Sequence, residues 1–217
     1  MAKKKSNTPP EDFLLLPAPP STLPIIDTHT HLASTFEAYR TRYPGGRYTD
    51  VHEFVKGIYE GRNVLGVVDV WCEAPVQRIW REFADAAWGK KDSGALDYRF
   101  VIGVHPHEAR HYNDDVERDM YVHCPHFNSP ANLPTSLEAL SHPSNVGLGE
   151  IGLDYHYDLS PHDFQQDVFR RQLRHAIRLG KPLTIHTREA EGDTERILKE
   201  EVPREHKVCD CMGPVMK

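Results

Sequence analysis

Histidines and acidic residues follow apolar, strand-like runs at four places that lie far apart in this chain. These places are IIDTHTH (25–31), GVHPH (103–107), GEIGLD (149–154) and IHTRE (185–189). His29 and His31 are two residues apart, so on a strand both imidazoles point to the same side. A parallel barrel gathers the C-terminal ends of its strands around one pocket. We therefore expect Glu150 and His186 to reach the same rim as this histidine pair and to form one metal site with it.

Each stretch is weak evidence when it stands alone. The chain has 14 histidines in 217 residues, so an H-x-H pair arises easily by chance. Glu150, beside Gly149, could equally be an exposed turn carboxylate, and His186 could be a core histidine whose hydrogen bonds are satisfied. What favours a shared metal site is that all four stretches come at strand ends.

Strand-like and helix-like runs alternate along the chain, which predicts βα units and a parallel sheet. The run from Val64 to Val70 is almost continuously apolar, as a strand buried on both faces should be. Trp80 and Trp88 belong to a stripe at helical spacing, which is expected to face the core rather than to stack on bases. The expected strands are 25–29, 64–70, 99–104, 146–151 and 183–186, and the expected helices are 50–61, 75–88, 135–141, 160–180 and 189–200.

The remaining segments are expected to be loops. A polar loop that contains Gly45-Gly46 should follow the first strand, and residues 108–133 have no clear period. Ser160-Pro161 supplies cap and first-turn residues for the long helix that Gly180 ends. Residues 202–211 would open a sixth βα unit.

The first 24 residues carry six of the 17 prolines and little to bury, so they are expected to form a flexible tail. Residues 25–217 then form a single domain. Phe13–Leu16 is too short for the apolar part of a signal peptide, and no stretch approaches the length of a membrane span. The lysines at 3–5 could bind nucleic acid or direct nuclear import, but a plain solvated terminus is the preferred interpretation.

The charge and the cysteines limit the possible functions. A formal charge of −6 argues against a broadly basic nucleic-acid surface but leaves room for a local basic groove. The chain contains no C-x-x-C pair, which favours a cytoplasmic or nuclear protein with reduced thiols. His123, Cys124 and His126 resemble a small zinc cluster, but they lack a second ligand pair, so a loop is the preferred interpretation.

Taken together, these motifs resemble the TatD-type metal-dependent deoxyribonucleases, which belong to the amidohydrolase-like barrel enzymes. The resemblance runs from about Ile25 to about Lys207, and its most specific element is the GEIGLD run at 149–154. It implies an α/β fold, the TIM-type (β/α) barrel, and a hydrolase that acts on DNA or another phosphodiester. A protein partner is possible but has no motif of its own.

The resemblance also implies two divalent metal ions: zinc, manganese or magnesium. In that family pattern His29 and His31 hold the first ion, Glu150 bridges the two ions, and His186 holds the second. Two ions that lie close together can lower the pKa of a bound water and hold the attacking and leaving oxygens of a phosphodiester.

Four further residues are candidates for roles around these ligands. His105 could contact the substrate phosphate or transfer a proton, or it could simply close a strand. Arg188 could bind a non-bridging phosphate oxygen, or it could pair with a neighbouring glutamate. Asp154 could orient a ligand or start a helix-initiating turn, and Asp27 could support the histidine pair or act as a cap.

The chain is expected to form an incomplete barrel. A complete one has eight βα units and roughly 250 residues, whereas about five to six units fit here. The family has a further metal-binding His after strand six and an Asp after strand eight, but here the strand-six position holds KVCDC (207–211). We therefore expect a C-terminally truncated chain, irregular or weakly paired over 208–217, with exposed apolar faces and at most weak activity.

Two other functions remain open. Relatives that hydrolyse amides or lactones on the same barrel often bridge their metals with a modified lysine on strand four. Glu150 occupies that place here, which favours the nuclease branch. A non-catalytic, partner-binding protein is the second alternative. The missing family ligands support it, and the retained histidines argue against it.

Overall fold

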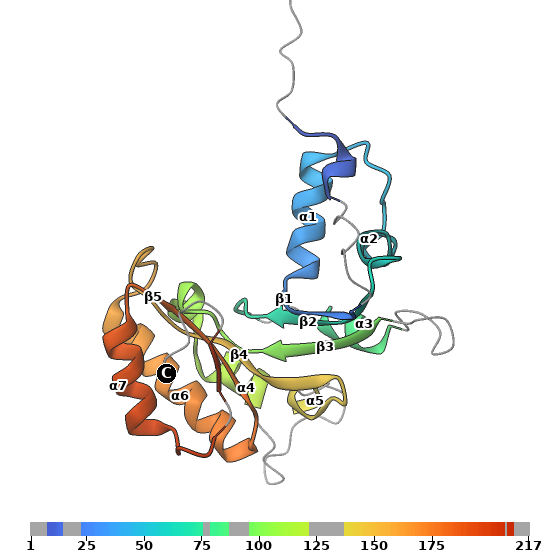
Figure 1. Ribbon diagram of the computed structural model, residues 1–217. Helices are drawn as coiled ribbons and strands as arrows, with labels where there is room; N and C mark the ends of the chain where they lie inside the picture. The colour runs from blue at the N-terminus through green and yellow to red at the C-terminus, as the bar shows by residue number, and fades with distance from the viewer. Residues whose placement is uncertain are drawn as a thin grey trace, which may run out of the picture. The chain divides into compact units, whose positions relative to one another are not determined.

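The chain divides into two compact units, which are described separately (Figure 1). Unit 1 comprises Met1–Val68 and Ala87–Tyr98, and unit 2 comprises Asp69–Ala86 and Arg99–Lys217. The computed structural model describes residues 8–14, 23–75, 79–86, 96–121, 137–206 and 208–210. Its strands form a sheet in the order β1-β2-β3-β4-β5-β6, the order of the sequence. Helices separate successive strands along the chain, so the predicted α/β class with βα units is confirmed.

Unit 1 is built around a cluster of aromatic side chains. Tyr39 on one helix lies with its ring centroid 4.9 Å from that of Phe54 on the next helix and 5.8 Å from that of Tyr48. Asp50 caps the second helix by accepting the backbone N–H groups of residues 52 and 53. The elements of this unit are η1 (Glu11–Leu14), β1 (Ile25–Thr30), α1 (Leu32–Arg42), α2 (Val51–Tyr59) and most of β2 (Val64–Trp71).

Two segments of unit 1 that were predicted as a loop and a flexible tail contain helices. Helix α1 lies where only a polar loop was predicted, and that prediction is wrong. Only Leu32 and Tyr39 of this helix are buried, so the sequence shows no regular apolar stripe. The short helix η1 lies in the segment predicted as a flexible tail. Within η1, Glu11 accepts hydrogen bonds from the Tyr39 hydroxyl and from the Arg47 backbone N–H.

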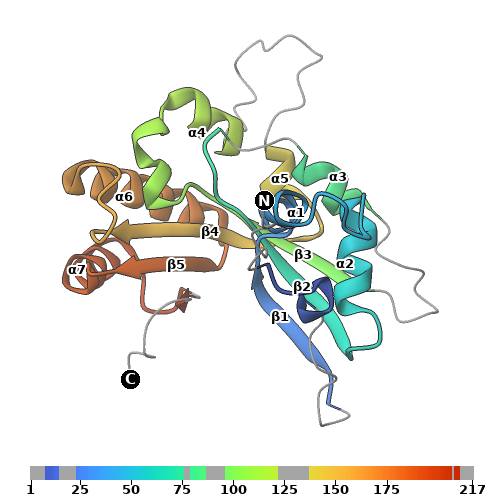
Figure 2. The ribbon, with the colours of Figure 1, turned by 90° about the horizontal axis from the view of Figure 1, so that it is seen from above.

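Unit 2 is a parallel sheet with helices packed against it. Strand β4 pairs in parallel with β3 on one side and with β5 on the other, and β5 pairs with β6. Figures 1 and 2 both show β4 and β5 side by side. The elements are α3 (Trp80–Asp85), β3 (Asp97–Ile102, which begins in unit 1), η3 (Pro106–His111), α4 (Asp114–Tyr121), α5 (Leu137–Ser141), β4 (Asn145–Asp154), α6 (His162–Leu179), β5 (Leu183–Arg188), α7 (Glu191–Glu201) and β6 (Val208–Asp210).

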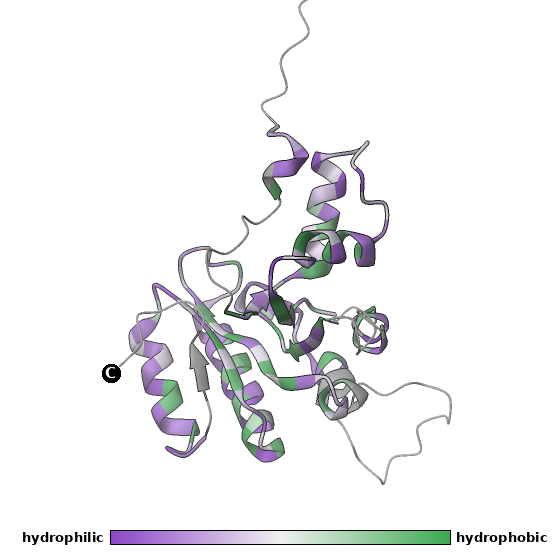
Figure 3. Ribbon diagram, turned by 45° about the vertical axis from the view of Figure 1, so that its right-hand side comes forward, coloured by the Kyte–Doolittle hydropathy of each residue, from purple (hydrophilic) through white to green (hydrophobic). Residues whose placement is uncertain are grey.

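The core of unit 2 lies between β4 and α6. Leu148, Ile151 and Leu153 of β4 are fully buried, and Phe169 and Leu173 of α6 are buried in the same way. Figure 3 shows apolar and polar bands alternating along α6, as expected for a helix with one face on a core. This packing holds the ends of β4 and β5 in place.

Several predicted boundaries in unit 2 need correction. Helices η3 and α4 occupy the first part of 108–133, where a loop was predicted; residues 122–136 are outside the described residues. The Ser160 hydroxyl accepts the Arg110 N–H instead of capping α6. Residues 208–210 form a strand of three residues that pairs with β5 at three positions, so this part of the segment expected to be irregular or weakly paired is a short paired strand. Residues 211–217 lie outside the described part.

Three other predictions concern cysteines, the aromatic helix and membranes. Cys72 is buried and has a free thiol, whereas His123, Cys124 and Trp88 are outside the described residues.

Of the predicted helix 75–88, the described part is helical over Trp80–Asp85, where Trp80 and Phe83 are buried in the core. In the described residues, every helix is too short or too polar to cross a membrane.

Gly152 allows β4 and β5 to approach each other at the register pair Gly152–His186. Its φ is +145°, and an added Cβ would lie 1.9 Å from the carbonyl oxygen of His186. We expect Gly152→Ala to lower the free energy of unfolding by about 1–3 kcal/mol or more, because it adds backbone strain and a backbone clash. Chemical denaturation would measure the change.

Gly192→Ala is the matched control for this substitution. Gly192 lies in α7 and has open space around an added Cβ, so the variant should keep or slightly raise the stability, by up to about 1 kcal/mol. Equal stability of Gly152→Ala and the wild-type chain would contradict the argument from close strand approach.

Candidate metal centre

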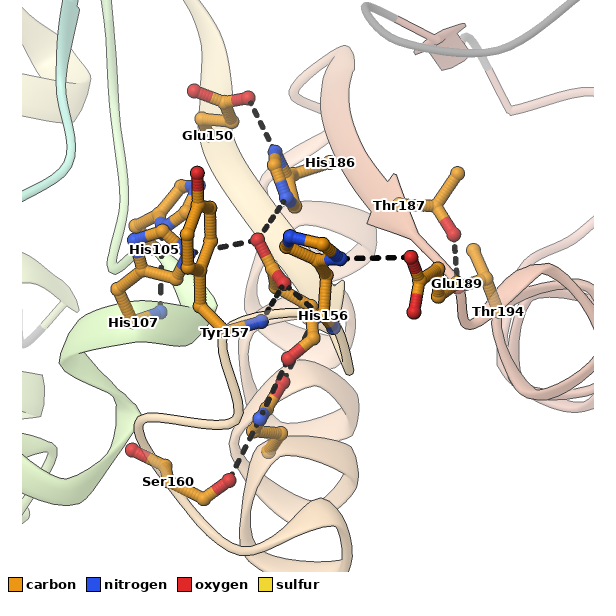
Figure 4. Close-up of polar contacts among 12 residues, drawn as sticks. His105, His107, Glu150, His156, Tyr157, Ser160, His186, Thr187, Glu189 and Thr194 are labelled. Carbon is orange, nitrogen blue, oxygen red and sulfur yellow. Dashed lines mark hydrogen bonds and ion pairs between the residues drawn. The ribbon is translucent and has the colours of Figure 1, made fainter.

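Strands β4 and β5 carry the acidic and imidazole side chains of a buried cluster in unit 2. Glu150 of β4 is 4% exposed and His186 of β5 is 5% exposed. The Nδ1 atom of His186 lies 3.1 Å from Glu150 Oε1, and its Nε2 atom lies 3.1 Å from Asp154 Oδ2. Figure 4 shows the His186 ring below the Glu150 carboxylate. The imidazole is thus held between two carboxylates.

His105 joins this cluster from the segment that follows β3. Its backbone N–H donates to the carbonyl of Cys72 at 2.9 Å, and its ring centroid lies 4.4 Å from that of His186. His105, Glu150 and His186 each offer a ligand atom, and these atoms lie within 4.8 Å of one another. The sequence predicted that His105 would lie close to Glu150 and His186, which come from the next two strands.

The donor set of this cluster fits a divalent cation. Two imidazoles and one carboxylate are the ligands that zinc and manganese commonly take, and the carboxylate also suits magnesium. Burial, together with the neighbouring His186 ring, lowers the pKa of His105 to about 3. The His105 ring is therefore neutral near pH 7, which is the state that binds a metal.

The two carboxylates also favour positive charge at His186. Burial alone would lower the pKa of His186, but the contacts with Glu150 and Asp154 outweigh it and raise the pKa above its ordinary value. The same electrostatic attraction that holds a proton on this ring acts on a metal cation at the same place.

Asp154, at the end of β4, makes both kinds of contact that the sequence suggested. Its Oδ2 lies 3.1 Å from His186 Nε2 and 2.7 Å from His107 Nε2. Its Oδ1 accepts the backbone N–H groups of His156 and Tyr157, both at 3.0 Å. Burial alone would raise the pKa of Asp154, but these hydrogen bonds outweigh it and lower the pKa to about 2. Asp154 is therefore an ionised acceptor that holds two imidazoles and a turn together.

Two glutamines of α6 fix the backbone next to these residues, and the sequence did not reveal them. Gln165 Oε1 accepts the Asp154 N–H at 2.9 Å, and its amide group donates to the Asp154 carbonyl at 3.1 Å. Gln172 makes the same paired contacts with the backbone of Val104, at 2.8 and 3.0 Å. Both glutamines are 1% exposed. The only available signal was two glutamines seven residues apart, on the buried face of a helix.

His107 and Arg188 lie at the edge of the cluster. The sequence singled out His105 in the GVHPH run and missed His107, whose contact with Asp154 ties it to the site. The guanidinium carbon of Arg188 lies 4.7 Å from the ring centroid of Tyr157, a cation–π contact. The Arg188 carbonyl accepts the backbone N–H of Tyr155 at 3.0 Å.

In unit 1, His29 and His31 converge as the strand spacing predicted. Their Nε2 atoms are 3.2 Å apart, so both ring nitrogens face one point. Asp27 Oδ1 accepts the backbone N–H of His29 at 3.2 Å, and its Oδ2 accepts the Tyr59 hydroxyl at 2.8 Å. Asp27 thus supports the end of β1 through the backbone. That this pair and the cluster of unit 2 form one centre stays a prediction.

Comparisons with known proteins find nucleases and metal-dependent hydrolases among the relatives of this chain. The profile of the TatD-related DNases matches residues 26–212. The chain is 32% identical over 188 residues to the human 3'-5' RNA nuclease TATDN2, and the matched region covers 84% of this chain and 21% of the relative. It is 48% identical over 180 residues to an uncharacterized metal-dependent hydrolase of Bacillus subtilis, YabD, and the matched region covers 82% of this chain and 56% of the relative.

A solved structure shows the same fold. The TatD family hydrolase of Entamoeba histolytica superposes with a TM-score of 0.56 at 20% identity, over 82% of this chain and 54% of that chain. The present chain therefore spans about half the length of the Bacillus relative and of this solved structure, and about a fifth of the human relative.

Proposed function

This chain belongs to the family of TatD-related DNases, and from that premise we propose that it hydrolyses phosphodiester bonds of nucleic acids with bound divalent metal ions. The observation that carries the proposal is the buried cluster in which Glu150 and His186 lie 3.1 Å apart, with His105 beside them. Glu150 occupies the strand-four position at which the amide- and lactone-cleaving relatives often have a lysine. The cluster therefore supports the nuclease branch over that alternative.

In this proposal, Glu150 and His186 hold the metal directly. His29 and His31 complete the ligand set with their converging Nε2 atoms, an assignment that rests on the family pattern. Asp154 holds one nitrogen of His186, so that the other nitrogen keeps a fixed direction toward the metal. When bound, two divalent ions supply an acidic water and polarise the phosphate.

Two residues are proposed to act on the substrate. His105 is neutral near pH 7 because its pKa is lowered to about 3. Its Nδ1 atom accepts the His107 backbone N–H at 3.2 Å, so the neutral ring carries its proton on Nε2 and can donate a hydrogen bond from there to a phosphate oxygen. Arg188 carries its charge on a flexible stem at the end of β5, and its planar fork suits a non-bridging phosphate oxygen.

The proposed substrate class is nucleic acid. The family description indicates DNA, whereas the human relative is described as a nuclease acting on RNA from the 3' end. We propose DNA ends as the substrate, and RNA is the competing substrate in the test. Zinc, manganese and magnesium are the proposed metals.

The test is release of nucleotides from labelled single-stranded DNA and RNA by the purified chain. The protein is stripped with a chelator and then reloaded with zinc, manganese or magnesium, and metal binding is followed by calorimetry. We expect binding of the metal and cleavage that disappears on chelation. Cleavage that survives chelation would contradict the metal mechanism. Metal binding without cleavage of either polymer would favour the partner-binding alternative.

A further inference from the structure

One aromatic ring of unit 2 lies at the surface beside the metal cluster. Tyr157 is 52% exposed, whereas Trp80, Phe100 and Phe169 of the same unit are in the core. Figure 4 shows the Tyr157 ring standing next to His107. The centroids of these two rings are 5.3 Å apart with an interplanar angle of 89°. The His107 ring centroid in turn lies 4.3 Å from that of His105, so a single side chain separates the exposed ring from the cluster.

The backbone, rather than core packing, sets the position of this ring. Asp154 Oδ1 accepts the Tyr157 N–H at 3.0 Å. Asp158, directly after Tyr157, has φ of 47°, and Glu189, directly after Arg188, has φ of 54°. Left-handed conformations are uncommon for residues other than glycine, and they cluster at binding and catalytic sites. Tyr157 and Arg188 thus each directly precede a residue in the left-handed conformation.

We propose that Tyr157 is a stacking platform for a nucleobase of single-stranded substrate, next to the phosphate that is cleaved. This inference rests on the proposed function. Arg188 lies over this ring and the His156 ring lies against it, with centroids 4.8 Å apart, yet about half of the residue stays exposed. Every base has an aromatic face, so this exposed part of the ring can accept any base of the sequence. A base-paired duplex hides those faces in its stack, so the platform favours single strands and frayed ends.

Arg188 gives the platform its positive charge. Its guanidinium carbon lies 4.7 Å from the Tyr157 ring centroid, and a stacked guanidinium keeps its N–H groups directed outward in the plane of the fork. The pair can therefore contact a base through the ring and the adjoining phosphate through the guanidinium. The neighbouring Glu189 carboxylate lies at hydrogen-bond distance, 2.8 Å, from His156 Nδ1.

The test separates base stacking from catalysis. A single-stranded oligonucleotide with 2-aminopurine at its 3' end is titrated with the metal-stripped full chain in the presence of EDTA. Stacking on Tyr157 quenches the 2-aminopurine fluorescence. We expect Tyr157→Leu to lose the quenching and to weaken binding by about 5- to 150-fold, the range for one stacked base. Tyr157→Phe keeps the ring and should behave as the wild-type chain.

Phe164→Leu is the matched control, because Phe164 is 40% exposed on α6 and is not part of the cluster. It should quench and bind normally. Normal quenching by Tyr157→Leu, or an equal loss in Phe164→Leu, would overturn the platform. If the wild-type chain cleaves with metal while Tyr157→Leu binds normally, the platform fails and the proposed function stands. If no polymer is cleaved but quenching depends on Tyr157, the platform stands and the proposed function fails.

Discussion

Glu150→Gln is expected to lower kcat/KM for metal-dependent cleavage by about a thousandfold or more, while the fold is retained. Metal-ion catalysis supplies several kcal/mol of transition-state stabilisation, and each 1.36 kcal/mol corresponds to about a tenfold change in rate. Glu150 is buried and lies 3.1 Å from His186, so its charge is directed at the proposed metal position. Glutamine has nearly the same shape, but it removes that charge and replaces one carboxylate oxygen with an NH₂ group.

Steady-state kinetics with saturating metal, together with calorimetric metal titration and thermal melting, would measure this loss. Glu195→Gln is the control, because Glu195 is an exposed carboxylate that pairs with Lys199 on the surface of α7. It should leave kcat/KM unchanged. Activity of Glu150→Gln within tenfold of the wild-type chain, with metal bound, would remove Glu150 from the mechanism.

The part of this site that the sequence predicted depends on strand periodicity. His29 and His31 had to point to one side because side chains alternate along a strand, and their Nε2 atoms do converge, 3.2 Å apart. His105, Glu150 and His186 were placed at strand ends of successive βα units, and parallel strands bring such ends together. Local pattern and topology were enough for these residues.

The remaining features depend on tertiary contacts that leave no local signature. Gln165 and Gln172 resemble ordinary helix residues until they are seen to bond the backbone at Asp154 and Val104. His107 gains its significance from a contact with a residue 47 positions later in the chain. Helix α1 was missed because only Leu32 and Tyr39 are buried, so its apolar period is too weak to be recognised in a sequence.

Asp154 combines two functions that the sequence presented as alternatives, and two substitutions can separate them. Its Oδ2 faces His186 and His107, whereas its Oδ1 accepts two backbone N–H groups of the following turn. Asp154→Asn can keep the turn through its remaining oxygen, but it places an NH₂ group or a neutral oxygen against the imidazoles. Asp154→Ala removes both sets of contacts.

We expect Asp154→Asn to weaken metal binding by about 10- to 100-fold, the usual effect of removing a group that orients a ligand, with little loss of thermal stability. Asp154→Ala should weaken metal binding to a similar degree and also lower the free energy of unfolding by about 1–3 kcal/mol, because backbone donors of the turn lose their acceptor. Competition with a metal-indicator dye and chemical denaturation would measure the two effects. Asp193→Asn, which alters a carboxylate that accepts the Tyr155 hydroxyl, should leave metal affinity unchanged. If Asp154→Asn bound metal as tightly as the wild-type chain, the carboxylate would only build the turn, and the direction of His186 would have to be set by Glu150 and the backbone of β5.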